Sequence, residues 1–245
     1  MTWVIFRLTL RQLLGQRRAV LVALFAAIPV VIAVVYRFGD HTARQEEFTA
    51  KLLLGGLVVG SLLPLAAVVF GTAALGSEIE DGTAVYLLSK PIARWEVVAG
   101  KFLAAWTITA AVVFLSTMLA GSIALYGAGD QQLVPAFAFA AALGAALYAM
   151  VFIALSIYTS RALIVGLTYV FLWEGLVTGL FQGTRLMSVR QYTLGIADAL
   201  SHVSKTTFDA DLAGTSAAIG MALAAVLATV LAVRRLERFE IGESG

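Results

Sequence analysis

The chain has 245 residues, of which 60% are hydrophobic and only 13% are charged, and its formal net charge is +2. This composition is far from that of a soluble domain and is typical of a protein embedded in a bilayer. The basic residues lie in short segments between apolar runs, which argues against a continuous surface that binds nucleic acid. The absence of cysteine excludes disulfides, thiolate nucleophiles and thiolate metal ligands.

The N-terminal segment predicts an amphipathic helix. Its apolar and polar residues fall on separate helical faces, with Trp3, Phe6, Leu10 and Leu13 on one face and Arg7, Arg11 and Gln16 on the other. Such a helix is suited to the membrane interface, and we expect it to form an elbow ahead of the first span. No small-residue cleavage site follows, so the segment is expected to remain uncleaved.

Six apolar stretches are each long enough to cross a bilayer. They are Ala19–Tyr36, Leu52–Leu75, Phe102–Tyr126, Val134–Tyr158, Ala162–Phe181 and Thr215–Val233. The shortest reaches about 27 Å as a helix, close to the hydrocarbon thickness of about 30 Å. No alternating pattern typical of a β-barrel occurs. The sequence therefore predicts an all-α, polytopic membrane protein with one domain over residues 1–245.

The distribution of basic residues predicts the orientation. With the N-terminus in the cytoplasm, 11 of the 17 Lys and Arg residues lie inside. Basic residues in short loops favour the cytoplasmic side, so we expect both termini in the cytoplasm. The loop between the second and third spans is then cytoplasmic. In the last outer connection, Ser188 and Gln191 form a possible capping box ahead of an amphipathic helix, which we expect to stay outside as a membrane anchor.

The loop between the second and third spans carries an unusual cluster of charge. Glu78, Glu80 and Asp81 come at the end of the second span, and Gly82 permits a sharp reversal. Thr83 can cap a short helix over residues 84–89, which Pro91 should end. The apolar side chains of this helix are Val85, Leu87 and Leu88, with Ile92 beyond it. They fit either a docking helix for a partner or a tight connection folded back on the bundle.

The same loop resembles that of a known family. The order Glu78, Gly82-Thr83, Leu87-Leu88-Ser89, Pro91, Arg94 and Gly100-Lys101 resembles the loop of ABC-2 type transporter permeases, above all the six-span group of the nitrous oxide reductase maturation permease. The segments YVFLWEGLVTGLF and MSVRQYTLGIADALS are also similar to that group. The resemblance covers most of the chain.

This resemblance implies that the loop is a coupling helix received by a separate ATP-binding cassette subunit. Glu78 and Gly82-Thr83, with Glu80 and Asp81, would shape the turn. Val85, Leu87 and Leu88 would contact the ATPase, and Pro91, Arg94 and Lys101 would mark the boundary to the third span. Two ATPase copies and a second permease copy, or a related permease, are implied partners. ATP and magnesium would bind the ATPase, in a bacterial cytoplasmic membrane.

Two features of the fifth span are further candidates. Glu174 is the only ionisable residue inside the six stretches, and a charge at that depth costs about 2.5–3.5 kcal/mol on insertion scales. It either lines a translocation pathway or makes a structural hydrogen bond to a neighbouring helix. Gly175, Gly179 and Gly183 recur every four residues and predict close helix packing, either within the subunit or at a dimer contact. A similar strip in the last span, Gly220, Ala224, Ala228 and Ala232, favours packing within the subunit.

Other chemistry is not supported by the sequence. There is no phosphate-binding loop, so the chain is not expected to be the ATPase or an enzyme. His41 and His202 lack nearby ligand residues in the sequence, and no metal site or cofactor is expected in this chain. The leading hypothesis is the permease subunit of an ABC exporter. A mechanical transmitter of ATPase motion without solute transport, and an ion-coupled secondary carrier, are the alternatives.

Overall fold

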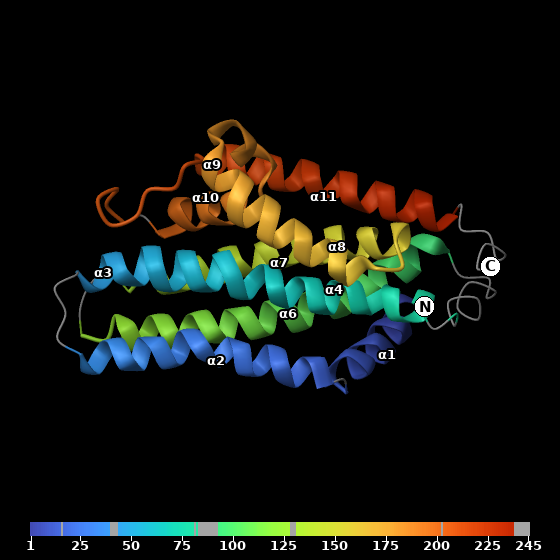
Figure 1. Cartoon of the computed structure of the whole chain (residues 1–245), viewed down its shortest axis with the longest axis horizontal. Coiled ribbons are helices and arrows are strands. Elements are labelled where there is room, and N and C mark those ends of the chain that lie inside the picture. The colour runs from blue at the N-terminus through green and yellow to red at the C-terminus, as the bar shows by residue number, and fades with distance from the viewer. Residues whose placement is uncertain are drawn as a thin grey trace.

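Figure 1 shows the computed structural model of the chain, which describes residues 1–15, 17–39, 44–80, 82, 93–127, 131–201 and 203–237. Every regular element among these residues is a helix. The helices are α1 (Thr2–Leu14), α2 (Arg17–Phe38), α3 (Gln45–Glu47), η1 (Phe48–Leu62), α4 (Leu63–Glu80), α6 (Arg94–Ala124), α7 (Leu133–Tyr158), α8 (Ala162–Thr168), η2 (Tyr169–Val177), α9 (Thr178–Leu180), η3 (Gln182–Met187), α10 (Val189–Ser201) and α11 (Gly214–Glu237). Of these, η1 and η2 are π-helices and η3 is a 3₁₀-helix.

Six helical segments of the described residues have the length and composition to cross a bilayer. They are α2, the continuous run α3–η1–α4, α6, α7, the run α8–η2–α9, and α11. This confirms the six predicted spans and the all-α class. The third helix begins at Arg94 rather than at the predicted Phe102. Its charged first turns stay helical because Val97, Val98 and Gly100 are buried, Gly100 against α1.

The core of the bundle is α7, which packs against α4, α6, α10 and α11. The most apolar window of α7 is 67% buried inside the subunit, against 22% for α2, for α8–η2–α9 and for α11. Alanine and glycine along α7 let its neighbours approach closely, which is the usual basis of helix packing in membranes. The three less buried spans therefore present most of their apolar side chains to lipid or to another chain.

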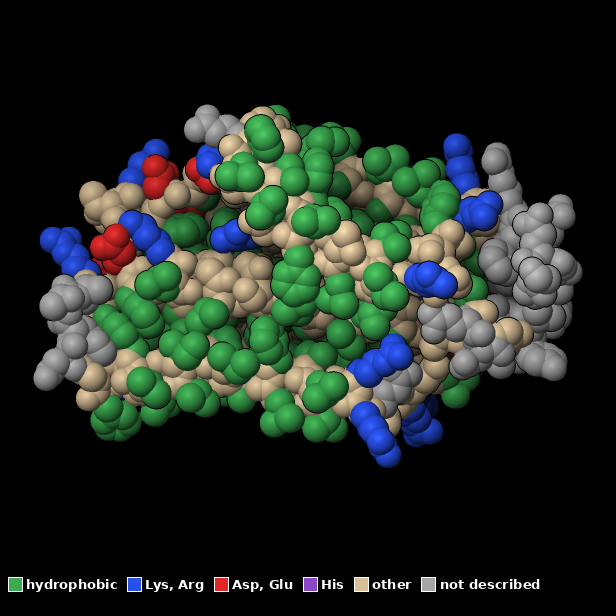
Figure 2. Space-filling view, viewed as in Figure 1, with side chains coloured by type: hydrophobic (Ala, Val, Ile, Leu, Met, Phe, Trp, Pro, Cys, Tyr) green, Lys and Arg blue, Asp and Glu red, His purple; other side chains and the backbone are tan. Residues whose placement is uncertain are grey.

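The ends of the bundle agree with the predicted parity of spans. In Figure 1 the N-terminus, the end of α4, the start of α6 and the end of α11 lie at the same end of the molecule. In Figure 2 the Lys and Arg side chains gather at the two ends, and hydrophobic side chains cover the surface between them. An even number of spans explains why the N-terminus and the end of α11 share one end. Which side of the membrane this end faces remains the prediction made from the basic residues.

Two arginine–tyrosine pairs lie at the helix ends. The Arg37 guanidinium at the end of α2 lies 5.5 Å from the ring centroid of Tyr126, just beyond α6. The Arg235 guanidinium near the end of α11 lies 5.4 Å from that of Tyr158, the last residue of α7. Tyrosine and arginine favour the level of the lipid head groups, so we expect the pairs to lie near the two limits of the hydrocarbon region.

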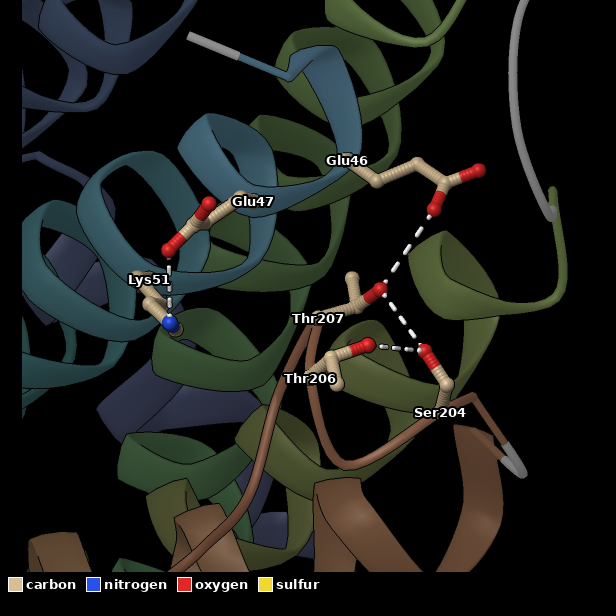
Figure 3. Close-up of polar contacts among 6 residues, drawn as sticks. All are labelled: Glu46, Glu47, Lys51, Ser204, Thr206 and Thr207. Carbon is tan, nitrogen blue, oxygen red and sulfur yellow. Dashed lines mark hydrogen bonds and ion pairs between the residues drawn. The ribbon is translucent and has the colours of Figure 1, made fainter.

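At the end of the bundle opposite the N-terminus, the connection 203–213 is held against the second span, as Figure 3 shows. The Thr207 hydroxyl donates to Glu46 over 3.5 Å and lies 3.1 Å from the hydroxyl oxygen of Ser204. The Phe208 ring packs edge-on against Phe137 of α7, with 5.0 Å between the centroids. Side chains from three segments thus fix this connection over the end of the bundle.

Candidate functional site

A buried ion pair joins the two helices from which the predicted coupling loop emerges. Lys101 on α6 pairs with Glu78 on α4, and the Lys101 side chain is only 2% exposed. A buried ammonium is strongly unfavourable without its counterion, so the pair fixes α4 and α6 relative to each other. The structure thus places Lys101 about two turns inside α6, and it gives Glu78 a partner that the sequence analysis did not assign.

Gly82 has the backbone conformation expected for a sharp reversal after α4. Its φ angle is +68°, in the left-handed region that favours glycine at the end of a helix. Its N–H donates to the Ile79 carbonyl over 3.2 Å. Arg94 is the first residue of α6. Outside the described residues lie Asp81, Thr83, Val85, Leu87, Leu88 and Pro91, as well as the side chain of Glu80.

Helix α1 contacts both helices that carry the loop. The Gln12 side-chain amide donates to the Ser77 hydroxyl near the end of α4 over 3.2 Å. Ile5 packs on Gly100 of α6 so closely that a Cβ added at Gly100 would lie 2.8 Å from Ile5 Cγ2. The buried face of α1 consists of Ile5, Thr9 and Leu13. Of the apolar face expected from the sequence, Leu13 is therefore buried, whereas Trp3 is 67% exposed.

At the opposite end of the bundle, Glu174 is 2% exposed and accepts three hydrogen bonds. The Tyr169 hydroxyl donates to Oε1 over 3.0 Å, the backbone N–H of Val189 donates to Oε1 over 2.9 Å, and the Ser188 hydroxyl donates to Oε2. A carboxylate with such donors at a helix N-terminus is stabilised by hydrogen bonding and by the helix dipole. Glu174 therefore makes structural hydrogen bonds, which was one of the two hypotheses from the sequence, the other being a place on the translocation pathway.

Ser188 connects this carboxylate to α10. Its Oγ accepts the N–H of Gln191 over 3.1 Å, which makes Ser188 the N-cap of α10. The predicted capping residue is thus confirmed. The link from Ser188 to Glu174 could not be read from the sequence, because the helix is broken at Phe181 and Ser188 lies 14 residues beyond Glu174.

Three further side chains surround the Glu174 site. The Tyr148 phenol of α7 is near enough to interact electrostatically with both Glu174 and Arg190. The Arg190 guanidinium lies over Gly60 of the second span, where an added Cβ would be 3.3 Å from Nε. Burial raises the pKa of Tyr192 on α10, and the negative charge of Glu174 raises it further. The phenol of Tyr192 therefore stays protonated and donates to the Leu186 carbonyl.

The placement of α10 corrects one expectation. The helix was expected to lie in the membrane interface on the outer side as an anchor, but it packs against α7, α11 and η1. Eight of its residues are buried, from Val189 to Ser201. Small residues on the partners make this possible, because an added Cβ at Gly220 of α11 would lie 2.5 Å from the Tyr192 ring. Glu174 thus anchors a helix that is wedged into the end of the bundle.

The two small-residue strips differ in their surroundings. In α11, Gly220 contacts Tyr192 closely, and Ala228 and Ala232 are buried, as expected for packing within the subunit. In the fifth span, a Cβ added at Gly179 or Gly183 would meet no atom within 4 Å. Gly175 has only a backbone atom of its own helix nearby. The helix ends at Leu180, so Gly183 lies in η3, apart from the other two.

The described residues include no group of three or more His, Cys, Asp or Glu side chains placed to hold a metal ion. His41 and His202 lie outside the described part. Asp211, one of the acidic residues of the connection 203–213, pairs with Arg185 of η3 over 2.7 Å.

Comparison with known proteins supports the resemblance noted in the sequence. A comparison with curated proteins finds no match. The family model described as "ABC-2 family transporter protein" matches residues 3–238, nearly the whole chain. The six apolar helices among the described residues agree with this match. The chain belongs to the ABC-2 family of transporter proteins and is a multi-pass membrane permease subunit.

Proposed function

We propose that the chain is the permease half of an ABC exporter, driven by a separate ATPase subunit. In this proposal two copies of the chain, or one copy and a related permease, assemble with two ATPase subunits that bind ATP and magnesium. The short helix over residues 84–89 is the coupling helix, and Leu87 and Leu88 enter a groove of the ATPase. The complex lies in a bacterial cytoplasmic membrane with both termini in the cytoplasm.

The observation that carries the proposal is the mechanical connection at the base of the loop. Glu78 and Lys101 join α4 to α6, and α1 contacts both helices through Gln12 and Ile5. A force on the loop would therefore move three helices together instead of bending the loop alone. Such a unit can transmit the closure of an ATPase to the bundle. The permease contributes shape and motion, and the chemistry takes place on the partner.

Glu174 has a defined place in this proposal. Its three hydrogen bonds hold α10 at the far end of the bundle, which supports a positioning role over direct contact with a transported solute. If α10 moves with the bundle during transport, Glu174 keeps it attached to the fifth span.

The coupling role is tested by capture of the ATPase. Leu87→Asp/Leu88→Asp should abolish recovery of the ATPase with the affinity-purified permease, because two charges cannot enter an apolar groove. Tyr86→Asp is the matched control, since it adds one charge in the same loop at a position not assigned to the groove. Full recovery with the double variant, while both variants insert normally, would contradict the proposal.

Reconstitution separates the exporter from its alternatives. Vesicles that contain the permease and its ATPase should move solute with ATP turnover, and Leu87→Asp/Leu88→Asp should remove both. ATP turnover without solute flux would favour a transmitter of motion. Solute movement driven by an ion gradient without any ATPase would favour a secondary carrier.

A further inference from the structure

An apolar groove runs along the side of the subunit between α7, α8 and α11. It has a volume of about 930 Å³, at the upper end of the range of sites that hold small ligands. One wall is a row of exposed side chains on α11, namely Ile219, Leu223, Leu227 and Leu231. The α7 wall includes Leu155 and Tyr158. The helices α8 and α11 that flank the groove are yellow and red in Figure 1.

The groove is long, and most of it offers nothing to a polar ligand. The α11 residues that line it run from Ser216 to Leu231, which is about 22 Å along the helix axis. Two tyrosines at its far end use their hydroxyls inside the protein, Tyr169 to Glu174 and Tyr192 to Leu186. Their hydroxyls are therefore already engaged by protein acceptors. The lining is otherwise almost entirely apolar apart from Ser216, which suits an apolar, extended ligand.

The end of the groove nearest the end of α11 is different, because a cationic group lies beside it. Tyr158, half exposed, forms this end, and the Arg235 guanidinium lies 5.4 Å from its ring centroid. An arginine that stacks by its face keeps its N–H edge free for a phosphate or carboxylate. Arg161 precedes α8, three residues beyond Tyr158. Among the described residues, no acidic side chain forms an ion pair with Arg161 or Arg235.

We propose that this groove is a binding site for one anionic phospholipid. An acyl chain lies between α7 and α11, and the phosphate head group lies at Arg235 and Arg161, in the leaflet at the end that carries the termini. The complementarity of charge at one end and of apolar surface along the rest selects a ligand with this distribution of groups, and basic sites between spans commonly bind lipid head groups. The inference goes beyond the proposed coupling to an ATPase and does not require it.

Native mass spectrometry of the intact chain, released from nanodiscs of equal phosphatidylethanolamine and phosphatidylglycerol, tests the site. The wild-type chain should retain phosphatidylglycerol preferentially. Arg235→Ala should lower that retention about fivefold, the effect expected for one basic residue near a lipid surface. Arg234→Ala is the matched control, since Arg234 is exposed at the same end but is not stacked on Tyr158; it should change retention less than twofold. Equal effects of the two variants, or no preference between the lipids, would overturn the proposal.

A second pair of variants tests the apolar part of the groove. Leu227→Trp should fill it and lower the retention of phosphatidylglycerol, whereas Val226→Trp, on the same helix but outside the groove, should not. Because the chain has no cysteine, Leu227→Cys gives a single thiol. If this variant forms a disulfide dimer in membranes, a second copy of the chain occupies the groove and the lipid assignment is wrong. None of these measurements uses the ATPase, so their failure is distinct from a failure of coupling.

Discussion

Glu174 is held by three hydrogen-bond donors, one from its own span and two from the start of α10. An acid inside a membrane span stands out, so Glu174 could be selected from the sequence. Its partners could not, because Ser188 and Val189 reach it from beyond the break at Phe181. For Lys101 the sequence indicated only a place at the boundary of the third span, because its partner Glu78 lies on another helix. Contacts between distant segments depend on how the helices pack, and a single sequence has no periodic pattern from which those contacts can be predicted.

Loss of the Glu174 carboxylate should destabilise the subunit. Glu174→Ala removes the acceptor of three buried or partly buried donors, and we expect a loss of about 3 kcal/mol in the free energy of unfolding. The apparent Tm, followed by tryptophan fluorescence in detergent, should fall by about 6–12 °C.

A double-mutant cycle distinguishes a positioning role from a pathway role. Ser188→Ala removes one donor to Glu174, so Glu174→Gln and Ser188→Ala should be less than additive in their effect on stability. Glu174→Gln should leave the substrate preference of the reconstituted transporter unchanged. Altered selectivity without loss of stability would instead place Glu174 on the translocation pathway.

The ion pair at the base of the loop can be compared with a surface pair in the same chain. Lys101→Met leaves Glu78 without this partner and should cost about 3 kcal/mol in the free energy of unfolding, because Lys101 is buried. Lys51→Met breaks the pair with Glu47, in which both side chains are 48% exposed, and should cost less than about 1 kcal/mol. Equal shifts in Tm for the two variants would show that the buried pair contributes no more than the exposed one.

At the level of elements, the helices themselves could be predicted better than their surroundings. Hydrophobic length was enough to predict six spans, since a bilayer requires about 20 apolar residues to cross it. The amphipathic stripe of α10 was also recognised, but a stripe does not show whether lipid or protein covers it. Small residues on the partner helix indicate that protein covers the stripe, because Gly220 leaves room for Tyr192. Nothing in the apolar runs indicated the π-helical stretches η1 and η2, which depend on backbone hydrogen bonding.

Two glycine substitutions should therefore behave in opposite ways. In Gly220→Ala the new methyl group collides with the Tyr192 ring, and the overpacking should cost about 1–3 kcal/mol in the free energy of unfolding. In Gly179→Ala the methyl group meets no atom within 4 Å, and alanine should stabilise the helix by up to about 1 kcal/mol. Thermal unfolding of the two variants checks the difference. A larger loss for Gly179→Ala would mean that another helix covers it.

For the whole molecule, the parity of spans and the family could be inferred from sequence, while assembly could not. The fifth span exposes Gly175 and Gly179 together with large apolar residues such as Phe171 and Leu176. Nothing among the described residues packs on the two glycines. A flat apolar strip of this kind is suited to contact another helix, which supports the proposed second permease copy on this face.

Crosslinking in native membranes tests this contact. Gly179→Cys should form a disulfide dimer on oxidation, since identical positions approach each other near the axis of a twofold contact. Leu115→Cys, exposed on α6 away from this strip, should remain monomeric. Equal crosslinking of both variants would indicate random collision, and none with either variant would exclude Gly179 from the axis of the dimer.

The arginine–tyrosine pairs near the two ends of the bundle have a consequence for the surrounding membrane. Each pair is most stable at head-group level, so the separation of Arg37–Tyr126 from Arg235–Tyr158 sets a preferred bilayer thickness. Short-chain lipids would force the helices to tilt or the membrane to stretch around them. The acyl-chain length of the host membrane would thereby adjust the tilt of the helices. A thinner bilayer would therefore change the conformation of the protein.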